Sequence, residues 1–211
     1  MRFLPLFVGC LAAAQAVAGT SFVSSTVSAG FGSLAVYEDF ESIVPKDTVL
    51  SSFTSGIITY TAEAGSNVAV ASAGYTNFGI SGATTSSTLV SNGDEDYTLT
   101  FSSAVRRIGF DTYTIDAAGA PNSVSGAPPV KVTVVTSAGT FQHDVVAGPD
   151  NFGFLGIVSD EAILSVNWYG RLGGVRNTGI DNVRIDEAVP EPGTLAALGL
   201  GLAALRRRAR K

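Results

Sequence analysis

The central part of this 211-residue chain is predicted to be all-β, a β-sandwich of about ten strands resembling a jelly roll. Short runs of β-branched and aromatic residues are separated by Gly, Asn, Asp and Pro, which is typical of strands joined by turns. No long stretch has the helical period of about 3.6 residues. Residues 19–188 are predicted to form one domain, because this length is sufficient for a single hydrophobic core.

The predicted strands are the runs in which apolar and polar positions alternate. They cover residues 34–40, 57–62, 67–72, 96–102, 105–113, 129–136, 140–146, 152–158, 163–169 and 180–186. Residues 136–139, Thr-Ser-Ala-Gly, predict a hairpin turn between two of these runs, and residues 91–96 predict another turn. Residues 114–128 are interpreted as a long connection, and a binding loop is the alternative.

The N-terminus has the three parts of a secretory signal. Arg2 supplies a positive charge, an apolar stretch follows, and Ala16-Val17-Ala18 has the small-x-small pattern that signal peptidase cleaves. The sequence therefore predicts a signal peptide at 1–18 and a mature chain that begins at Gly19. Lipidation at Cys10 is the alternative interpretation. Cleavage after Ala18 removes the single cysteine, so no disulfide would stabilise the body.

The C-terminus combines a Pro-Glu-Pro motif with a short apolar run and a basic end. The apolar run, Thr194 to Leu205, would span about 18 Å as a helix, whereas a bilayer core is about 30 Å thick. We therefore expect transient membrane association, with the arginines on the cytoplasmic side and the body outside. The predicted membrane-stop residues are Arg206, Arg207, Arg208 and Arg210.

Residues 189–211, VPEPGTLAALGLGLAALRRRARK, resemble the PEP-CTERM sorting signal of Gram-negative bacteria. The resemblance implies that Pro190, Glu191 and Pro192 are the sorting motif and that exosortase, a membrane protease, recognises the tail. It also implies transient anchoring in the inner membrane, followed by delivery to the cell envelope, the cell surface or the extracellular matrix of a biofilm.

Four segments of the body also resemble known domains. They are YEDFES, YTLTFSSAVRRIGFDTY, FGFLGIVSDEAILSVNW and GIDNVRID, and they are similar to sandwich domains found upstream of PEP-CTERM tails. These domains resemble carbohydrate-binding jelly rolls, in which an acidic first strand meets an Asp-Asn last strand. The resemblance implies an exopolysaccharide as a partner.

The body is strongly acidic. Between positions 19 and 188, seven basic residues stand against 17 acidic residues, which gives a formal net charge of −10. This charge repels phosphate backbones, so nucleic acid is not an expected partner. With His143 as the only histidine and no cysteine after cleavage, the mature chain lacks the ligands of a zinc site.

Calcium is the metal that the sequence favours, because exported proteins meet calcium at concentrations that fill weak oxygen sites. Asp181 has the parity of Val183 and Ile185, so its carboxylate is expected on the core side of its strand. Glu38 has the parity of Phe40 and is expected there too. The candidate calcium ligands are Glu38, Asp39, Glu41 and Asp181. In the alternative interpretation, Asp181 caps a turn and Glu38 pairs with an arginine.

Tyr75 and Tyr169 are the candidate residues for stacking on a sugar ring. Trp168 shares the parity of Leu164 and Val166 and is expected in the core instead.

Two functional hypotheses remain. The first is an exported, non-enzymatic surface or matrix protein that binds exopolysaccharide. The second is an exported carbohydrate-active enzyme similar to glycoside hydrolases, which need two carboxyl groups. The candidates for that pair are Glu38, Asp39, Glu41, Asp94, Glu95, Asp96, Asp160 and Glu161.

Overall fold

The structure, a computed structural model, describes residues 19–25, 31, 34–74, 85–92, 96–116, 130–145, 152–169 and 176–187. All helical or strand structure in these segments is β-strand, which confirms the all-β prediction. No membrane-spanning helix is found in them. The predicted signal peptide at 1–18, the tail at 189–211 and Tyr75 lie outside these segments.

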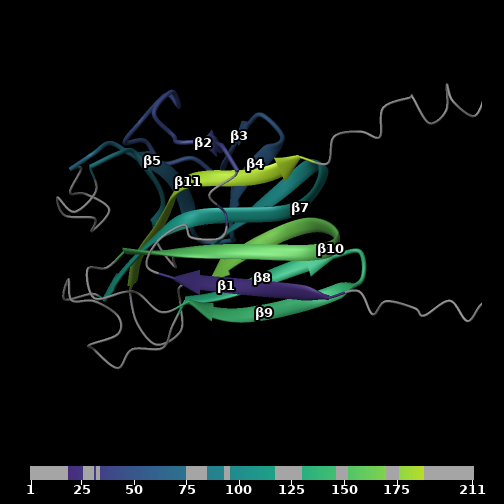
Figure 1. Ribbon diagram of the computed structural model, residues 1–211. Helices are drawn as coiled ribbons and strands as arrows, with labels where there is room; N and C mark the ends of the chain where they lie inside the picture. Colours follow the sequence, from purple (N-terminus) through teal and green to yellow (C-terminus); the bar gives the residue numbers. More distant parts are fainter. Residues whose placement is uncertain are drawn as a thin grey trace, which may run out of the picture.

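Eleven strands lie in the described segments (Figure 1). They are β1 (Thr20–Ser25), β2 (Val36–Glu38), β3 (Ser52–Ser55), β4 (Ile58–Ala62), β5 (Asn67–Ala71), β6 (Thr88–Asn92), β7 (Asp96–Asp116), β8 (Val130–Thr136), β9 (Gly139–Val145), β10 (Phe152–Tyr169) and β11 (Arg176–Glu187). The predicted hairpin turn is confirmed between β8 and β9. The prediction misses β1, β3 and β6, which are short and lack a clear apolar alternation.

Two predicted strand breaks are wrong. Residues 96–102 and 105–113 belong to one strand, β7, and residues 152–158 and 163–169 belong to one strand, β10. The pairing between β10 and β7 shifts register between Val158 and Ile163. Such an irregularity bends a strand without ending it. The residues between Val158 and Ile163 therefore form a bend within β10 and not a turn between two strands.

The two long strands divide the fold into two layers (Figure 1). The first, which we call the β11 layer, contains β5, β6, β11, the second half of β7, the first half of β10, and β1, with β2 added to β11. The second, the β8 layer, contains β3, β4, the first half of β7, the second half of β10, β8 and β9. β7 and β10 therefore connect the layers covalently.

The core lies between these layers and is centred on Trp168, which is 1% exposed. Its ring meets Phe110 of the β11 layer edge-on at 5.8 Å between centroids and stacks on Tyr97 at 6.2 Å. Its Nε1–H donates a 2.9 Å hydrogen bond to Oγ1 of Thr178 in β11. The prediction of a buried Trp168 is confirmed, and this side chain joins the two layers.

Alternation fails at Leu164, which the sequence places with Trp168 in the core. Leu164 is 50% exposed, whereas Val166 is fully buried. The register shift between Ile163 and Ser165 inserts an extra residue, so that Leu164 and Ser165 both turn outward.

The chain enters and leaves the fold at the same end (Figure 1). Ser21 of β1 pairs with Val158, Val158 pairs with Arg107, and Arg107 pairs with Asp186 near the end of β11. These four residues lie on adjacent strands, so the first and last strands are about 14 Å apart at this point.

We predict that Thr178→Val lowers the free energy of unfolding by about 1–3 kcal/mol, because valine fills the same space but leaves the buried indole N–H without its acceptor. Urea denaturation followed by the fluorescence of Trp168, the only tryptophan, measures this loss. The exposed control Thr100→Val should change stability by less than about 0.5 kcal/mol. Equal midpoints for the two variants would show that the indole hydrogen bond does not hold the layers together.

Candidate functional site

The outer surface of the β8 layer consists mainly of uncharged polar side chains. Cross-strand pairing arranges them in two rows that cross all six strands of the layer. One row contains Thr54, Thr59, Thr100, Ser165, Val135 and Thr140, and the other contains Ser52, Thr61, Thr98, Asn167, Thr133 and Gln142. We call these two rows the hydroxyl face.

The alternation of the strands produces this surface. In β8, for example, Val130, Val132 and Val134 are buried, while Lys131, Thr133 and Val135 are only partly covered and face outward. Because most apolar residues take the buried positions, the outward positions of β4, β7, β8 and β10 in this layer are mostly Thr, Ser and Asn.

Hydrogen bonds between neighbouring strands order part of the hydroxyl face. Asn167 Nδ2 donates to Thr98 Oγ1 at 3.0 Å, and the hydroxyl oxygens of Thr54 and Thr59 are 2.9 Å apart. Hydroxyl and amide groups are both donors and acceptors, so they retain capacity for a ligand. The hydroxyl face can therefore both donate and accept hydrogen bonds.

Charged groups lie at one end of the hydroxyl face. Tyr169 pairs with Lys131, and Lys131 pairs with Asp144, in the next row of the sheet. Lys131 Nζ and Asp144 Oδ1 form a 3.0 Å ion pair. Glu63 accepts hydrogen bonds from Thr98 and Asn167. Tyr169, a predicted sugar-binding residue, is partly exposed at this margin, on the end of the fold opposite the chain ends.

The outer surface of the β11 layer has a different character, because two carboxylates face each other there. Asp111 of β7 and Asp181 of β11 are directly opposite across the strand pair, an arrangement that is destabilising for like charges. Asn182 Nδ2 donates to Asp111 Oδ2 at 2.9 Å and to Asp181 Oδ2 at 3.2 Å. Arg184 Nη1 lies 3.3 Å from Asp111 Oδ1. These two donors offset the repulsion.

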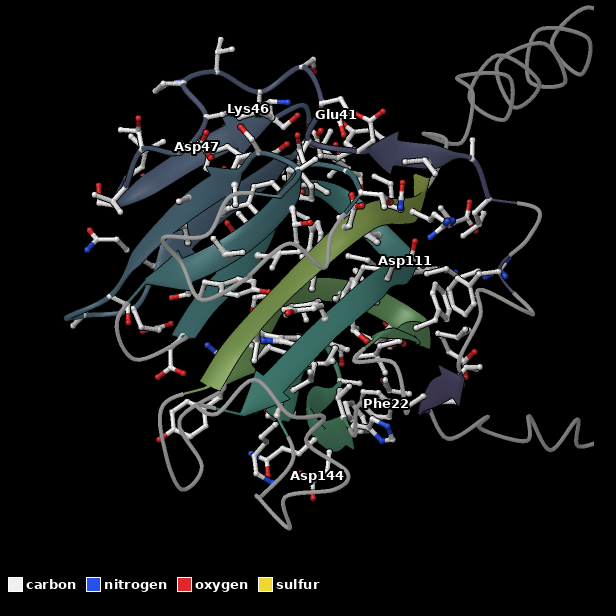
Figure 2. The ribbon with its side chains drawn as sticks, turned by 90° about the vertical axis from the view of Figure 1, so that its left-hand side faces the viewer. Phe22, Glu41, Lys46, Asp47, Asp111 and Asp144 are labelled. Atoms are coloured by element: carbon white, nitrogen blue, oxygen red, sulfur yellow. The ribbon has the colours of Figure 1, made fainter. Side chains whose placement is uncertain are left out.

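The pKa values of Asp181 and Glu41 are shifted in opposite directions. Burial raises the pKa of Asp181; the hydrogen bonds from Ser86 and Asn182 oppose this rise, and the charges of Asp111 and Glu41 add to it. The pKa of Glu41 is lowered, first by the backbone amide of Ser87 and then by Lys46, whose Nζ is 3.1 Å from Glu41 Oε2 (Figure 2). We call Glu41, Asp111 and Asp181 the carboxylate cluster.

The expectation that Asp181 faces the core is wrong. Asn182 has a positive φ of 49°, and the β7–β11 register shifts between Asp181 and Arg184. This bulge reverses the alternation, so that Ile180 and Val183 are buried while Asp181 lies on the outer surface. Glu38, by contrast, is buried as expected at 5% exposure.

The four candidate calcium ligands have separate partners. Glu38 accepts hydrogen bonds from Ser55 Oγ and from the backbone N–H of Phe40, and Asp39 accepts one from the N–H of Glu41. Neither an arginine nor Asp181 bonds to Glu38 in the part of the chain that the structure describes. Within the described segments, no group of three or more His, Cys, Asp or Glu side chains is arranged so that it could hold a metal ion, and this includes the carboxylate cluster. Calcium binding itself stays a prediction.

Sequence reasoning missed Asp111 as a member of the carboxylate cluster. Its partner lies on a strand that is about 70 residues away in the chain, and register cannot be read from alternation. Of the other candidate carboxylates, Asp160 lies beside Gly19, Glu161 accepts a hydrogen bond from Ser137, and Asp94 and Glu95 lie outside the described segments.

Phe31 covers part of the β11 layer next to the carboxylate cluster. It packs against Phe154 at 5.3 Å between centroids, and Arg107 lies 5.2 Å from its ring centre. A Cβ on Gly156 would come within 2.1 Å of the Phe31 ring, so a larger residue at that position would displace this ring. The hydroxyl face has no comparable cover among the described residues.

Comparisons with known proteins identify the tail. Residues 188–211 match the PEP-CTERM protein-sorting motif, which confirms the resemblance seen in the sequence. No curated protein matches the chain.

Solved structures of family 29 carbohydrate-binding modules are similar to the body at low identity. One mutant of CBM29-2 has 10% identity and a TM-score of 0.34, with coverage of 79% of this chain and 91% of its own. Another, complexed with mannohexaose, has 12% identity and a TM-score of 0.33, with coverage of 79% and 92%. A similarity at this level says nothing about a shared ligand.

We predict that Asp181→Asn raises the melting temperature at pH 7 by about 1–2 °C. A carboxyl group with a raised folded-state pKa contributes stability at low pH and loses it as the pH rises through that pKa. The advantage of the variant should therefore shrink as the pH falls towards about 4. Calorimetry from about pH 3.5, slightly below the ordinary pKa of an aspartate, to about pH 7.5 measures it.

Glu41→Gln is the control of opposite sign. Because the pKa of Glu41 is lowered, its contribution is present at neutral pH and lost as the pH falls through its folded-state pKa. This variant should be less stable than the wild type at pH 7 and approach it in acid. A destabilised Asp181→Asn at pH 7 would show that the charge of Asp181 is favourable in the folded state, contrary to the expected sign.

Proposed function

We propose that this chain is an exported, non-enzymatic surface or matrix protein that binds a neutral polysaccharide through the hydroxyl face. The sorting motif at 188–211 indicates an exported protein and is the observation that carries the first half of the proposal. Exosortase as the processing enzyme, signal peptidase at Ala18–Gly19, and the envelope or biofilm matrix of a Gram-negative bacterium as the destination belong to the proposal as well.

The direction of the chain ends supports display of the body. β1 begins and β11 ends at one end of the fold, while Tyr169, Lys131 and Asp144 lie at the other. A body held by its C-terminal tail would therefore present this opposite end, and the flank that carries the hydroxyl face, away from the attachment.

The chemistry of the hydroxyl face favours a neutral, hydroxyl-rich polymer. Sugar hydroxyls need partners that both donate and accept hydrogen bonds, as Thr98, Asn167 and Thr133 do. Uncharged groups are also cheaper to desolvate than ions. The net charge of −10 on the body disfavours anionic polymers. Two rows that cross six strands allow many weak contacts along one polymer chain.

The carboxylate cluster favours the second candidate, a carbohydrate-active enzyme. Glycoside hydrolases use a general acid with a raised pKa and a second carboxylate that acts as base or nucleophile. Asp181 has a raised pKa and lies opposite Asp111, so the two resemble such a pair. We prefer a structural role, because Asn182 and Ser86 occupy oxygens of Asp181 and Arg184 occupies an oxygen of Asp111. Calcium binding by Glu38, Asp39, Glu41 and Asp181 stays a separate prediction from the sequence.

Binding is tested with wild-type protein and the variant Thr100→Arg, which places a charge in the middle of the hydroxyl face. We expect at least about a tenfold loss of affinity for a neutral polysaccharide, equivalent to about 1.4 kcal/mol. Affinity electrophoresis in gels containing cellulose derivatives, mannan, starch or alginate measures it. The matched control is Ser21→Arg, which adds the same charge to an exposed hydroxyl residue of the other layer.

The outcomes separate the two candidate functions. Binding without turnover, lost in Thr100→Arg and retained in Ser21→Arg, supports the proposal. New reducing ends that the wild type produces and Asp111→Asn does not would show that the protein is a carbohydrate-active enzyme instead. An equal loss of affinity in Thr100→Arg and Ser21→Arg would show that the hydroxyl face is not the binding surface.

Replacing Pro190, Glu191 and Pro192 together by alanine should prevent processing of the tail. We expect the variant to accumulate in the membrane fraction with its arginines, because the motif that the protease would recognise is missing. Cell fractionation with mass spectrometry measures this, and Glu161→Ala in the body is the control. A triple variant that reaches the surface with a shortened tail would show that the motif is dispensable.

A further inference from the structure

Gly19, the first described residue, lies against the corner of β10. Its backbone N is 3.4 Å from Asp160 Oδ2, and its carbonyl oxygen accepts a 3.2 Å hydrogen bond from the N–H of Asp160. Beside it, the hydroxyl groups of Thr20 and Ser159 are 3.2 Å apart. A carboxylate, a backbone N–H and a hydroxyl thus converge on the first two residues after Ala16-Val17-Ala18.

We infer that Asp160 is a binding site for the amino group that signal peptidase creates at Gly19, so that removal of the signal peptide completes the attachment of β1. This inference rests on the export proposed above and on cleavage between Ala18 and Gly19. The ligand is the α-ammonium group of the mature chain itself.

Cleavage changes the chemistry of the Gly19 nitrogen. Before cleavage it is an uncharged amide with one N–H. Water adds across the Ala18–Gly19 peptide bond, the hydroxyl goes to the carbonyl carbon of Ala18, and the nitrogen leaves with a proton. At neutral pH the new carboxylic acid ionises and the amine, whose ordinary pKa is about 7.7–8.0, becomes an ammonium with three donors. An amide hydrogen bond to Asp160 thereby becomes an ion pair.

Asp160 is suited to this partner by its surroundings. Within the described segments, its carboxylate accepts a hydrogen bond from Gly19 alone. The adjacent acid, Glu161, is engaged by Ser137 Oγ. On the other neighbouring strands, Arg107 of β7 lies in line with Ser21, and His143 of β9 stacks on Phe22. The ion pairs Lys46–Glu41, Lys131–Asp144 and Arg184–Asp111 do not involve Asp160.

The attachment of β1 affects an open edge of the sandwich. Among the described strands, β1 pairs with β10 alone, and it carries Phe22 (Figure 2). The Phe22 ring stacks on His143 of β9, with 4.7 Å between ring centroids and 8° between planes. Phe22 also packs against the core. Terminal strands fray unless they are tied down. An ion pair at Gly19 would therefore keep β1 paired with β10 and keep Phe22 in place at the edge of the sheet.

The test compares the chain beginning at Gly19 with the same chain acetylated at Gly19, which removes the charge. We expect acetylation to lower the melting temperature at pH 7 by about 1–4 °C and to speed hydrogen exchange in β1. Asp160→Asn should abolish this difference while keeping the backbone N–H bond to Gly19. Glu161→Gln is the matched control and should preserve it. The difference should shrink as the pH rises above about 8, the upper end of the ordinary pKa range of an α-amino group, and the amine loses its charge.

Equal melting temperatures for the two forms, or a difference that persists in Asp160→Asn, would overturn the inference. Sequencing the N-terminus of protein recovered from cells is an independent measurement. A mature chain that starts elsewhere would overturn the proposed cleavage, even if the Gly19 form behaved as expected in vitro.

Discussion

The fold depends on β7 and β10, two strands that continue from one layer into the other. They pair with each other along both halves, and the other strands attach to them directly or through intervening strands. The corner at which they cross holds the layers in register with a core centred on Trp168. The same corner lies beside Gly19 and near Glu187, so the geometry of the two long strands also sets where the chain enters and leaves.

Alternation along these strands produces two outer surfaces of different chemistry. In the β8 layer, the outward positions are mainly Thr, Ser, Asn and Gln, which desolvate at modest cost and bond in either direction. In the β11 layer, Asp111 and Asp181 repel each other and need Asn182 and Arg184 to stay together. The first surface can meet a neutral partner over a wide area, whereas the second uses its polar contacts internally.

Local pattern predicted the all-β class, the β8–β9 hairpin and the burial of Trp168, because each depends on alternation within a few residues. Two features reversed alternation: the bulges at Leu164 and at Asn182 each insert a residue and turn the next side chain to the other side. The carboxylate cluster and the hydroxyl face depend on register between distant strands, which a single sequence does not specify. The tail was readable because its motif is contiguous.

We propose that this chain is exported, processed at both ends and displayed with its body outward. Intact-mass spectrometry of the protein recovered from the native cell surface tests both ends at once. We expect a chain that begins at Gly19 and ends near Pro190-Glu191-Pro192, without the arginines of the tail. Recovery of surface protein that retains residues 1–18 or the complete arginine tail would contradict the claim.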